Sequence, residues 1–120
     1  MTEIRLTRQG DIDLVFDGIV LADVSTREEG QPRWSEYCIY KTESGKWVTT
    51  VVGKSMVRDE IDRARITVCE TPVEVRDSLR RVAIVSGQSR NPYLTNAALD
   101  ALDEATENDP ELAGANEERI

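Results

Sequence analysis

The sequence predicts an α+β fold: an antiparallel β-meander of five to six curved strands, containing two hairpins, followed by two C-terminal helices. Three observations predict this order. Short β-branched and aromatic runs alternate with turn residues up to residue 69. The apolar period then changes from two to about 3.6 residues, and each helical pattern opens on a capping residue followed by proline. The 120 residues suit one domain with one modest core, which we place at 1–108, before an acidic, flexible tail at 109–120.

The first hairpin is predicted around the Asp17-Gly18 pair. Alternation over residues 4–7 gives a strand that stops at the turn signal Gln9-Gly10. Apolar runs at 12–16 and 19–24 then flank Asp17-Gly18. An Asp-Gly pair in this position favours a type I′ turn, because such a turn needs positive φ at both central residues. Residues 25–33 are polar and are expected to form the first loop.

The second hairpin is predicted over residues 34–52. Its two strands, 34–42 and 47–52, are rich in aromatic and β-branched residues. The segment between them, Glu43-Ser44-Gly45-Lys46, suits a type I turn closed by a glycine in the left-handed region. A last strand follows at 61–69, where Ala64, Ile66 and Val68 alternate with polar residues and one side of the strand is expected to face water.

Both helices have clear sequence signals at their beginnings. Thr71-Pro72-Val73-Glu74 is a capping box with proline at the first helical position, and Ser86-Gly87 predicts the end of this first helix. Asn91-Pro92 predicts the start of the second helix, which Pro110 ends. The apolar stripe of the second helix consists of Leu94, Ala98, Ala101, Leu102 and Ala105. This stripe is small, so the helix could pack on its own domain or only on a partner.

Negative charge is concentrated in the last quarter of the chain. Residues 1–90 contain fourteen basic and fifteen acidic residues, a net charge of −1. Residues 91–120 contain one arginine and eight acidic residues, a net charge of −7, which is nearly all of the chain's net charge of −8. Such a field disfavours non-specific contact with phosphate backbones or anionic lipid and favours a basic partner. The plainer interpretation is that these acids keep the protein soluble.

The leading functional hypothesis is a small, acidic, non-enzymatic interaction protein that binds a basic protein partner. One version is an inhibitor or regulator of a nucleic-acid-binding protein, because carboxylates along a helix can imitate a row of phosphates. The residues expected to contact the partner are Asp100, Asp103, Glu104, Glu107, Asp109 and Glu111. Direct nucleic-acid binding and membrane association are not expected under this hypothesis.

An alternative is a nucleic-acid-binding module built on the aromatic hairpin. Aromatic side chains on a ribbon can stack on the bases of a single strand when cations surround them. The residues of this face would be Trp34, Lys41, Lys46, Trp47, Lys54, Arg58, Arg63 and Arg65. Cross-strand aromatics more often pack a sheet against its core, and Glu36 and Glu43 dilute the positive charge.

A third hypothesis is a small-ligand protein or carboxylate-based enzyme around Asp59, Glu60 and Asp62. A solvated cluster of ion pairs is the better explanation of the same residues. The chain has no histidine, so a Ser-His or Cys-His nucleophile pair cannot form. Gly53-Lys54-Ser55 has the last letters of a phosphate-binding loop, but the glycine required five positions earlier is a valine. We therefore predict no catalytic residue, no metal ligand and no cofactor.

The cysteines and the N-terminus favour a cytoplasmic protein. Cys38 and Cys69 each fall in a predicted strand and are expected to be buried, reduced thiols. A disulfide between them would require adjacent strands. Zinc is disfavoured because the chain lacks both CxxC and histidine. No apolar run approaches the ~18 residues of a membrane helix, and the N-terminus lacks the layout of a signal peptide.

Overall fold

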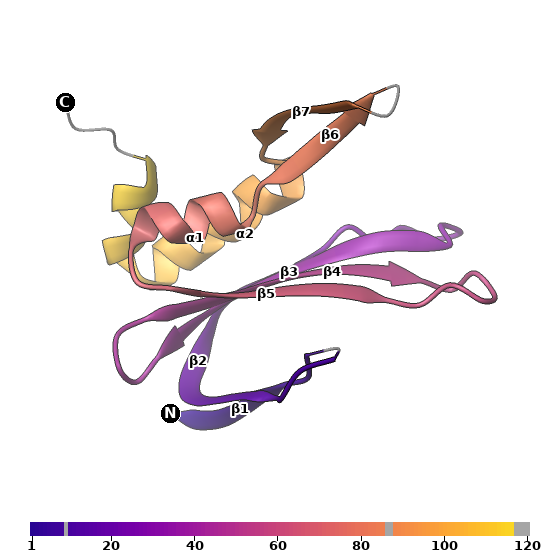
Figure 1. Cartoon of the computed structure of the whole chain (residues 1–120). Helices are drawn as coiled ribbons and strands as arrows, with labels where there is room; N and C mark the ends of the chain where they lie inside the picture. Colours follow the sequence, from indigo (N-terminus) through magenta and orange to yellow (C-terminus); the bar gives the residue numbers. More distant parts are fainter. Residues whose placement is uncertain (9, 86–87, 117–120) are drawn as a thin grey trace.

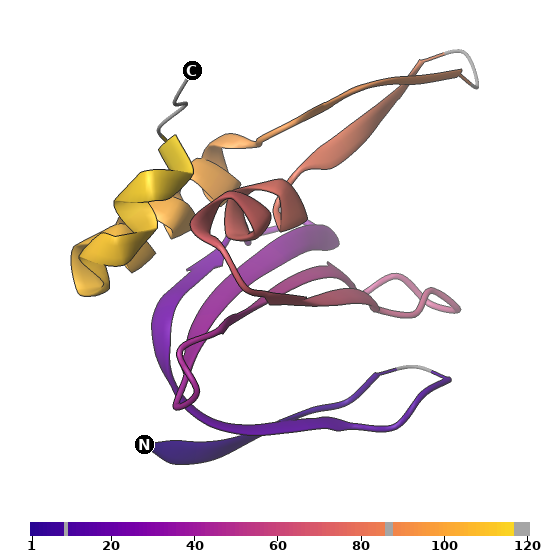
Figure 2. The same ribbon diagram turned by 60° about the vertical axis from the view of Figure 1, so that its left-hand side comes forward.

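A computed structural model describes residues 1–8, 10–85 and 88–116, with residues 81–93 and 115–116 described by their backbone alone. Five antiparallel strands form one curled sheet, in which sequence order is also spatial order. These strands are β1 (Thr2–Leu6), β2 (Leu14–Ser25), β3 (Arg33–Thr42), β4 (Trp47–Ser55) and β5 (Arg63–Cys69). The helices lie on one face of this sheet, and the β1–β2 end curls away from them (Figures 1 and 2). The α+β meander predicted from the sequence is therefore confirmed.

The Asp17-Gly18 turn was predicted wrongly, because β2 continues through this pair without a break. Gly18 pairs with Thr2 of β1 on one side and with Thr42 of β3 on the other. Its role is close packing: a Cβ atom there would lie 2.5 Å from the backbone oxygen of Lys41. The first hairpin instead turns through the segment between β1 and β2, where Gly10 has φ of +72° and Gln9 lies outside the described residues.

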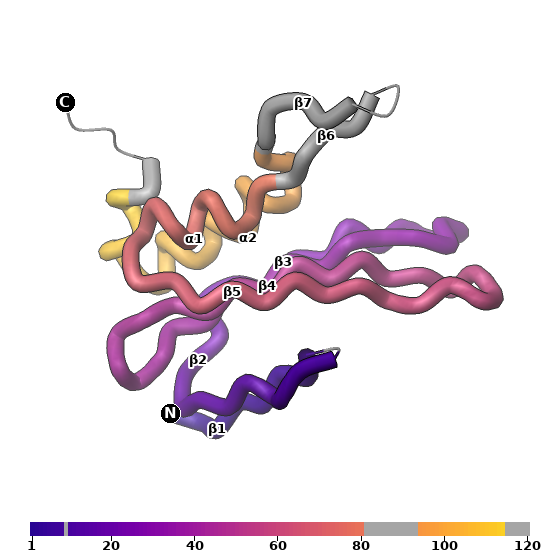
Figure 3. The backbone as a smooth tube through the Cα atoms, in the orientation of Figure 1, coloured from indigo at the N-terminus to yellow at the C-terminus, as the bar shows by residue number. Residues whose placement is uncertain are grey.

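The second hairpin and the last strand form close to the predicted residues, although β4 extends to Ser55 and β5 begins at Arg63, instead of at 52 and 61. β3 pairs with β4 in continuous register from Arg33↔Ser55 to Lys41↔Trp47. Gly45 has φ of +89° in the connecting turn, as a left-handed closing glycine requires. β5 then pairs with β4 from Gly53↔Arg63 to Trp47↔Cys69, and the three strands run side by side in Figure 3.

Alternation along the strands divides the sheet into two faces of different character. The helix-covered face carries the core, which is joined by the buried residues of the helices. The core consists of Leu21, Ala22, Tyr37, Ile39, Trp47 and Cys69 from the sheet and Val75, Leu79, Ala98, Ala101, Leu102, Ala105 and Leu112 from the helical layer. The register shift between Val20 and Ala22 is a bulge that lets two consecutive residues, Leu21 and Ala22, both be buried.

Helix α1 (Pro72–Ser78) is shorter than predicted. Its start is as expected, since the Thr71 side chain accepts a hydrogen bond from the backbone N–H of Glu74 at 3.2 Å. Its end is not: the predicted Ser86-Gly87 terminus lies outside the described residues, and the backbone from Arg81 onward is already strand β6 (Arg81–Val85). The run Val82-Ala83-Ile84-Val85 is a β-forming pattern as well as a helical one, and the strand prevails.

Strand β6 pairs with β7 (Gln88–Tyr93) in a separate two-stranded sheet, which projects from the helical layer in Figures 1 and 2. The Asn91-Pro92 pair lies inside β7, so the predicted start of the second helix was also wrong. Helix α2 (Asn96–Asn108) begins instead after Thr95, whose side chain accepts a hydrogen bond from Ala98 N–H at 3.1 Å. Tyr37 of β3 shares a 3.0 Å hydrogen bond with the same hydroxyl and fixes this helix end to the sheet.

Helix α2 packs on its own domain, which resolves the question that the sequence left open. Its stripe of Ala98, Ala101, Leu102 and Ala105 is fully or almost fully buried, and Asn108 Nδ2 donates to the backbone oxygen of Leu21 at 2.8 Å. The expected flexible tail needs correction over Pro110–Asn116, which form the 3-10 helix η1. Leu112 of η1 is fully buried in the core, and η1 packs against α1.

Candidate interaction surfaces

The exposed face of α2 presents four carboxylates to solvent. Because the alanine stripe faces the sheet, the opposite side of the helix carries Asp100, Asp103, Glu104 and Glu107, all of which are exposed. The helix contains no lysine or arginine. Within the described part of the chain, none of these four side chains takes part in the ion pairs that the structure shows. This group, Asp100, Asp103, Glu104 and Glu107, is called the α2 acidic face below.

The other two predicted acids, Asp109 and Glu111, contact a lysine of the same chain. Lys41 Nζ lies 3.0 Å from Asp109 Oδ2 and 2.9 Å from Glu111 Oε2. The same ammonium lies 4.0 Å from the centroid of the Trp47 ring, and Trp47 Nε1 donates to Asp109 Oδ2 at 3.1 Å. These four residues form the Lys41 cluster, which joins η1 to the second hairpin.

Burial and hydrogen bonding act in opposite directions on the charges of this cluster. Burial alone would raise the pKa of Asp109, but hydrogen bonds from Lys41 and Trp47 outweigh it and hold that pKa below its usual value. Burial likewise opposes the charge of Lys41, yet hydrogen bonds to Glu111 and Asp109 raise its pKa overall. Lys41 and Asp109 are therefore both charged at neutral pH, and both carboxylates of the cluster already have partners.

The aromatic hairpin does not present one stacking platform. Trp47 is the cross-strand partner of Lys41, so these two residues share a face of the sheet. Trp34 lies on the same strand as Lys41, an odd number of residues before it, so Trp34 points to the opposite face. Trp47 is 3% exposed within the core. Trp34 donates from Nε1 to Glu36 at 2.8 Å, and its other contact is the guanidinium of Arg27, 4.5 Å from the ring centroid.

The cations of the proposed nucleic-acid face are dispersed and largely partnered. Lys46 pairs with Glu70 at 3.2 Å and Lys54 with Asp62 at 3.4 Å. Arg65 donates to the backbone oxygens of Ser78 and Arg80, at the C-terminal end of α1, at 2.6 and 2.9 Å. Arg63 begins β5, and Arg58 lies in the loop before it. The structure thus brings Lys41 and Trp47 together but does not gather the eight residues on one surface.

The carboxylates at 59–62 have structural roles in the β4–β5 loop. Arg33 donates two hydrogen bonds, at 2.8 and 2.7 Å, to the two carboxylate oxygens of Glu60. These bonds, together with one from Ser55, lower the pKa of Glu60 to about 2. Asp62 accepts from the backbone N–H of Ser55 at 3.0 Å, and Asp59 occupies the left-handed region with φ of 70°. Ion pairs join this loop to the strands, through Arg33–Glu60 and Lys54–Asp62. These contacts agree with the interpretation of the carboxylates as a cluster of ion pairs.

The two cysteines are free thiols on different strands and different faces. Cys69 is buried in the core on β5, and Cys38 is partly buried on the other face of β3, with β4 between the two strands. Burial is the main cause that raises the pKa of each thiol. Both sulfurs therefore stay protonated and unreactive at neutral pH.

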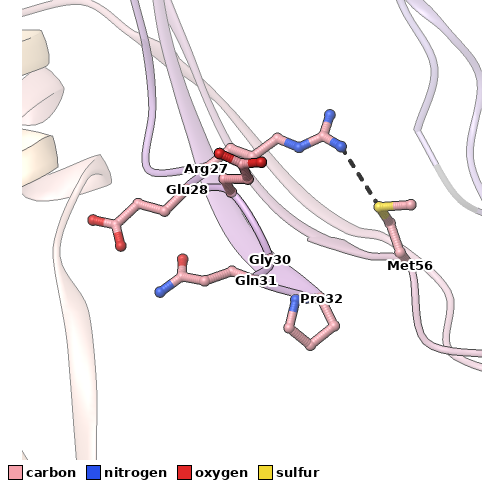
Figure 4. Close-up of a pocket in the computed structure, with 7 residues that line it drawn as sticks. Arg27, Glu28, Gly30, Gln31, Pro32 and Met56 are labelled. Carbon is pink, nitrogen blue, oxygen red and sulfur yellow. Dashed lines mark hydrogen bonds between the residues drawn. The ribbon is translucent and has the colours of Figure 1, made fainter.

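A hollow of about 610 Å³ lies beside the loop between β2 and β3. Figure 4 shows that its side chains diverge: Arg27 extends to the sulfur of Met56, at 3.6 Å, whereas Glu28 and Gln31 point elsewhere. Groups that diverge do not build a binding site. In the described part of the chain, no group of three or more Cys, Asp or Glu residues is arranged to hold a metal ion.

The uncovered, concave face of the sheet forms a trough that sequence reasoning missed. Two adjoining hollows, of about 500 and 280 Å³, follow this face. Their apolar lining consists of Leu6, Leu14, Phe16, Tyr40, Val48, Val52, Ala64, Ile66 and Val68, with Cys38 and Thr50 between them. Phe16 and Tyr40 meet edge to face with ring centroids 5.6 Å apart. The available signal was the apolar side of residues 64–68. The polar side of this strand was the one expected to face water, yet Arg65 on that side donates a hydrogen bond to the backbone oxygen of Ser78 at the end of α1.

No family model, curated protein or solved structure matches this chain. None of the helices in the described ranges has the length and apolar composition needed to cross a bilayer. The functional argument therefore depends on the two surfaces described above, the α2 acidic face and the trough.

Proposed function

We propose that this chain is a small, non-enzymatic, cytoplasmic interaction protein that binds a basic protein partner through the α2 acidic face. The observation that supports the proposal is the exposure of four carboxylates on one helix without any basic residue on it. These charges belong to a chain with a net charge of −8. A field of this sign accelerates association with a positive surface and repels other anions.

One version of the proposal is imitation of nucleic-acid charge. The four acids occupy positions i, i+3, i+4 and i+7, so they follow one side of the helix. A protein that binds phosphate backbones offers a matching positive surface, and an acidic helix could occupy it as an inhibitor or regulator. The same negative field disfavours direct contact between this protein and nucleic acid.

Affinity capture from the native host, with a charge-neutralised variant, tests the proposal. The variant carries Asp100→Asn, Asp103→Asn, Glu104→Gln and Glu107→Gln. A control with the same net charge carries Glu3→Gln, Glu28→Gln, Glu29→Gln and Asp59→Asn, all at exposed positions outside α2. Captures at about 0.1 M and about 1 M salt compare weak with strong screening of the attraction between exposed charges. We expect a basic protein to be retained by the wild type and the control at low salt, and released by high salt.

The proposal predicts a much weaker complex for the α2 variant than for the control. Purified partner and surface-binding kinetics would place most of this loss in the association rate, because exposed charges steer encounters. Equal loss in the two variants would show that net charge matters and the helix does not. A captured partner that is acidic, or one whose retention is independent of salt, would reject the proposal.

A further inference from the structure

Strand β5 forms one wall of the trough and is also an edge strand. In the described sheet it pairs with β4 on one side and with no strand on the other. An edge strand presents a row of backbone N–H and C=O groups that can pair with an added strand, and β5 offers seven residues for this purpose. Its trough side carries Ile66 and Val68, and Val68 is 47% exposed. An open edge with an apolar side is a place where another chain can join the sheet.

The sequence of β5 is complementary to itself when two copies run antiparallel. A two-fold axis at Ile66 pairs all seven residues of one copy with all seven of the other. Ala64 then lies opposite Val68 of the second copy, and Arg65 lies opposite Thr67. Residues directly opposite in an antiparallel pair point to the same face of the sheet. The apolar side of one β5 therefore continues into the apolar side of the other, and no two arginines lie directly opposite each other.

The other face of β5 carries an arginine without a carboxylate partner. Helix α1 lies over the end of β5 from which it continues (Figure 1). Its last turn reaches as far as Arg65, which donates to the backbone oxygens of Ser78 and Arg80 at 2.6 and 2.9 Å. Arg63, two residues earlier on the same face, is exposed. In the described part of the chain it takes part in none of the ion pairs that the structure shows.

A carboxylate that could partner Arg63 lies at the opposite end of β5. Glu74, in the first turn of α1, is exposed and accepts a hydrogen bond from the backbone N–H of Glu70 at 2.7 Å. Burial is the main cause that raises the pKa of Cys69, and the negative charge of Glu74 also raises it, so this carboxylate lies near Cys69. In the antiparallel arrangement, Arg63 of each copy lies opposite Cys69 of the other. Two-fold symmetry therefore brings Arg63 towards Glu74 twice.

The lengths of the elements leave room for this arrangement. Helix α1 has seven residues and is about 10 Å long, whereas the seven paired residues of β5 span about 20 Å. Each α1 therefore covers its own half of the seam, and the two helices do not compete for one place. Two acids flank the seam, Asp62 and Glu70, and each already pairs with a lysine of its own chain, Lys54 and Lys46.

We propose that the protein forms a two-fold symmetric dimer in which the β5 edges of two copies pair antiparallel about Ile66, with Arg63 of each copy paired to Glu74 of the other. The two five-stranded sheets then form one continuous sheet, and the backbone groups of each β5 edge are satisfied by the other copy. This inference goes beyond the proposed function because β5 is a different surface from the α2 acidic face.

Sedimentation equilibrium of the full chain, with two charge-reversal variants, tests the dimer. We expect the wild type to be dimeric at about 0.1 mM chain and to dissociate on dilution. Arg63→Glu and Glu74→Arg each place like charges at both contacts, so we expect each variant to dimerise at least about tenfold more weakly. An equimolar mixture of the two variants has opposite charges at both contacts of the mixed dimer. We expect this mixture to dimerise about as tightly as the wild type.

Matched lysine variants test the position of the seam. Ile66→Lys places two lysines directly opposite each other at the two-fold axis, so we expect at least about tenfold weaker dimerisation. Val20→Lys is the control, because Val20 is an exposed apolar residue of β2, away from the β5 edge. The α2 variant of the preceding section should still dimerise, and Ile66→Lys should still capture the basic partner. Failure of either proposal is therefore seen separately from failure of the other.

Four outcomes would overturn this inference. The first is a wild type that stays monomeric at about 0.1 mM. The second is a dimer that neither charge-reversal variant weakens. The third is a mixture of these two variants that dimerises no more tightly than each variant alone. The fourth is an equal effect of Ile66→Lys and Val20→Lys in proteins with native circular dichroism spectra, which would place the interface elsewhere on the chain.

Discussion

Replacing Lys41 by methionine removes the cation that lies between Trp47 and two carboxylates. The side chains of Lys41 and Asp109 are 18% and 16% exposed, so this pair is shielded from water far more than an ordinary surface ion pair. We expect Lys41→Met to lower the free energy of unfolding by about 2 kcal/mol. The reason is that Asp109 keeps its burial but loses the one charged donor among its three hydrogen-bond donors, which are Lys41, the Trp47 ring and the backbone N–H of Glu111.

The geometry sets the size of the effect. At a separation of 3.0 Å and an effective dielectric constant of about 20, the Coulomb attraction is about 5.5 kcal/mol before the cost of desolvation. Partial burial of both groups offsets most of this attraction. We therefore expect a coupling free energy of about 1–2 kcal/mol between Lys41 and Asp109 in a double-mutant cycle.

Urea unfolding of four proteins measures this coupling: the wild type, Lys41→Met, Asp109→Asn and the double variant. Asparagine at 109 keeps an oxygen that can accept the hydrogen bond from Trp47. A coupling free energy below about 0.3 kcal/mol, the usual error of additivity, would refute the reasoning. It would mean that Lys41 and Asp109 interact no more than two exposed charges do.

The pH dependence of the same cycle has a defined sign. The pKa of Asp109 is lower in the folded protein than its ordinary value of 3.8, so its contribution is complete above about pH 5 and declines as the pH falls through the folded-state pKa. The pKa of Lys41 is raised above 10.5, so its contribution is complete below that value and declines only at higher pH. The difference in stability between wild type and Asp109→Asn should persist at pH 7 and shrink towards pH 2.

Three further predictions concern the fold. Gly18→Ala should destabilise the protein by about 1–3 kcal/mol, because its Cβ would collide with a backbone oxygen. Gly53→Ala, whose Cβ would lie 3.8 Å from the backbone oxygen of Arg63, should cost much less in the same urea experiment. Leu112→Ala should lower the free energy of unfolding by about 2–5 kcal/mol, because this side chain is fully buried. The Glu60 carboxyl should titrate by ¹³C NMR with a pKa of about 2, moving towards 4.5 in Arg33→Gln.

Each of these predictions has a result that contradicts it. Equal losses of unfolding free energy in the two glycine variants would show that the collision at residue 18 does not determine the effect of the substitution. A Leu112→Ala variant as stable as the wild type would mean that η1 contributes nothing to the core. A Glu60 carboxyl that titrates near 4.5 in the wild type would show that the ion pair between Arg33 and Glu60 does not form in solution.

Local sequence signals predicted several parts of the fold correctly. The β3–β4 hairpin, its left-handed Gly45 and the Thr71 cap depend on residues that are near one another in the chain. Local signals gave wrong predictions where one residue pattern is compatible with two different backbone structures. Asp17-Gly18 is a turn pattern and also a site for close backbone approach, and Asn91-Pro92 is a helix start and also part of a strand.

Some features of the candidate surfaces also follow from local sequence patterns. The alanine stripe and the four acids of α2 follow from helical periodicity, so the sequence alone determined which residues share each side of that helix. The sequence also determined the net charge and where along the chain it is concentrated.

Only the tertiary structure decided which charges remain available and which apolar surfaces are covered. Lys41 and Glu111 are seventy residues apart in sequence, and no local pattern predicts that they meet. The opposite faces of Trp34 and Trp47 and the open trough likewise depend on strand register and on which side of the sheet the helices cover. The physical reason is that ion pairing and burial depend on distance in space, whereas periodicity records only spacing along the chain.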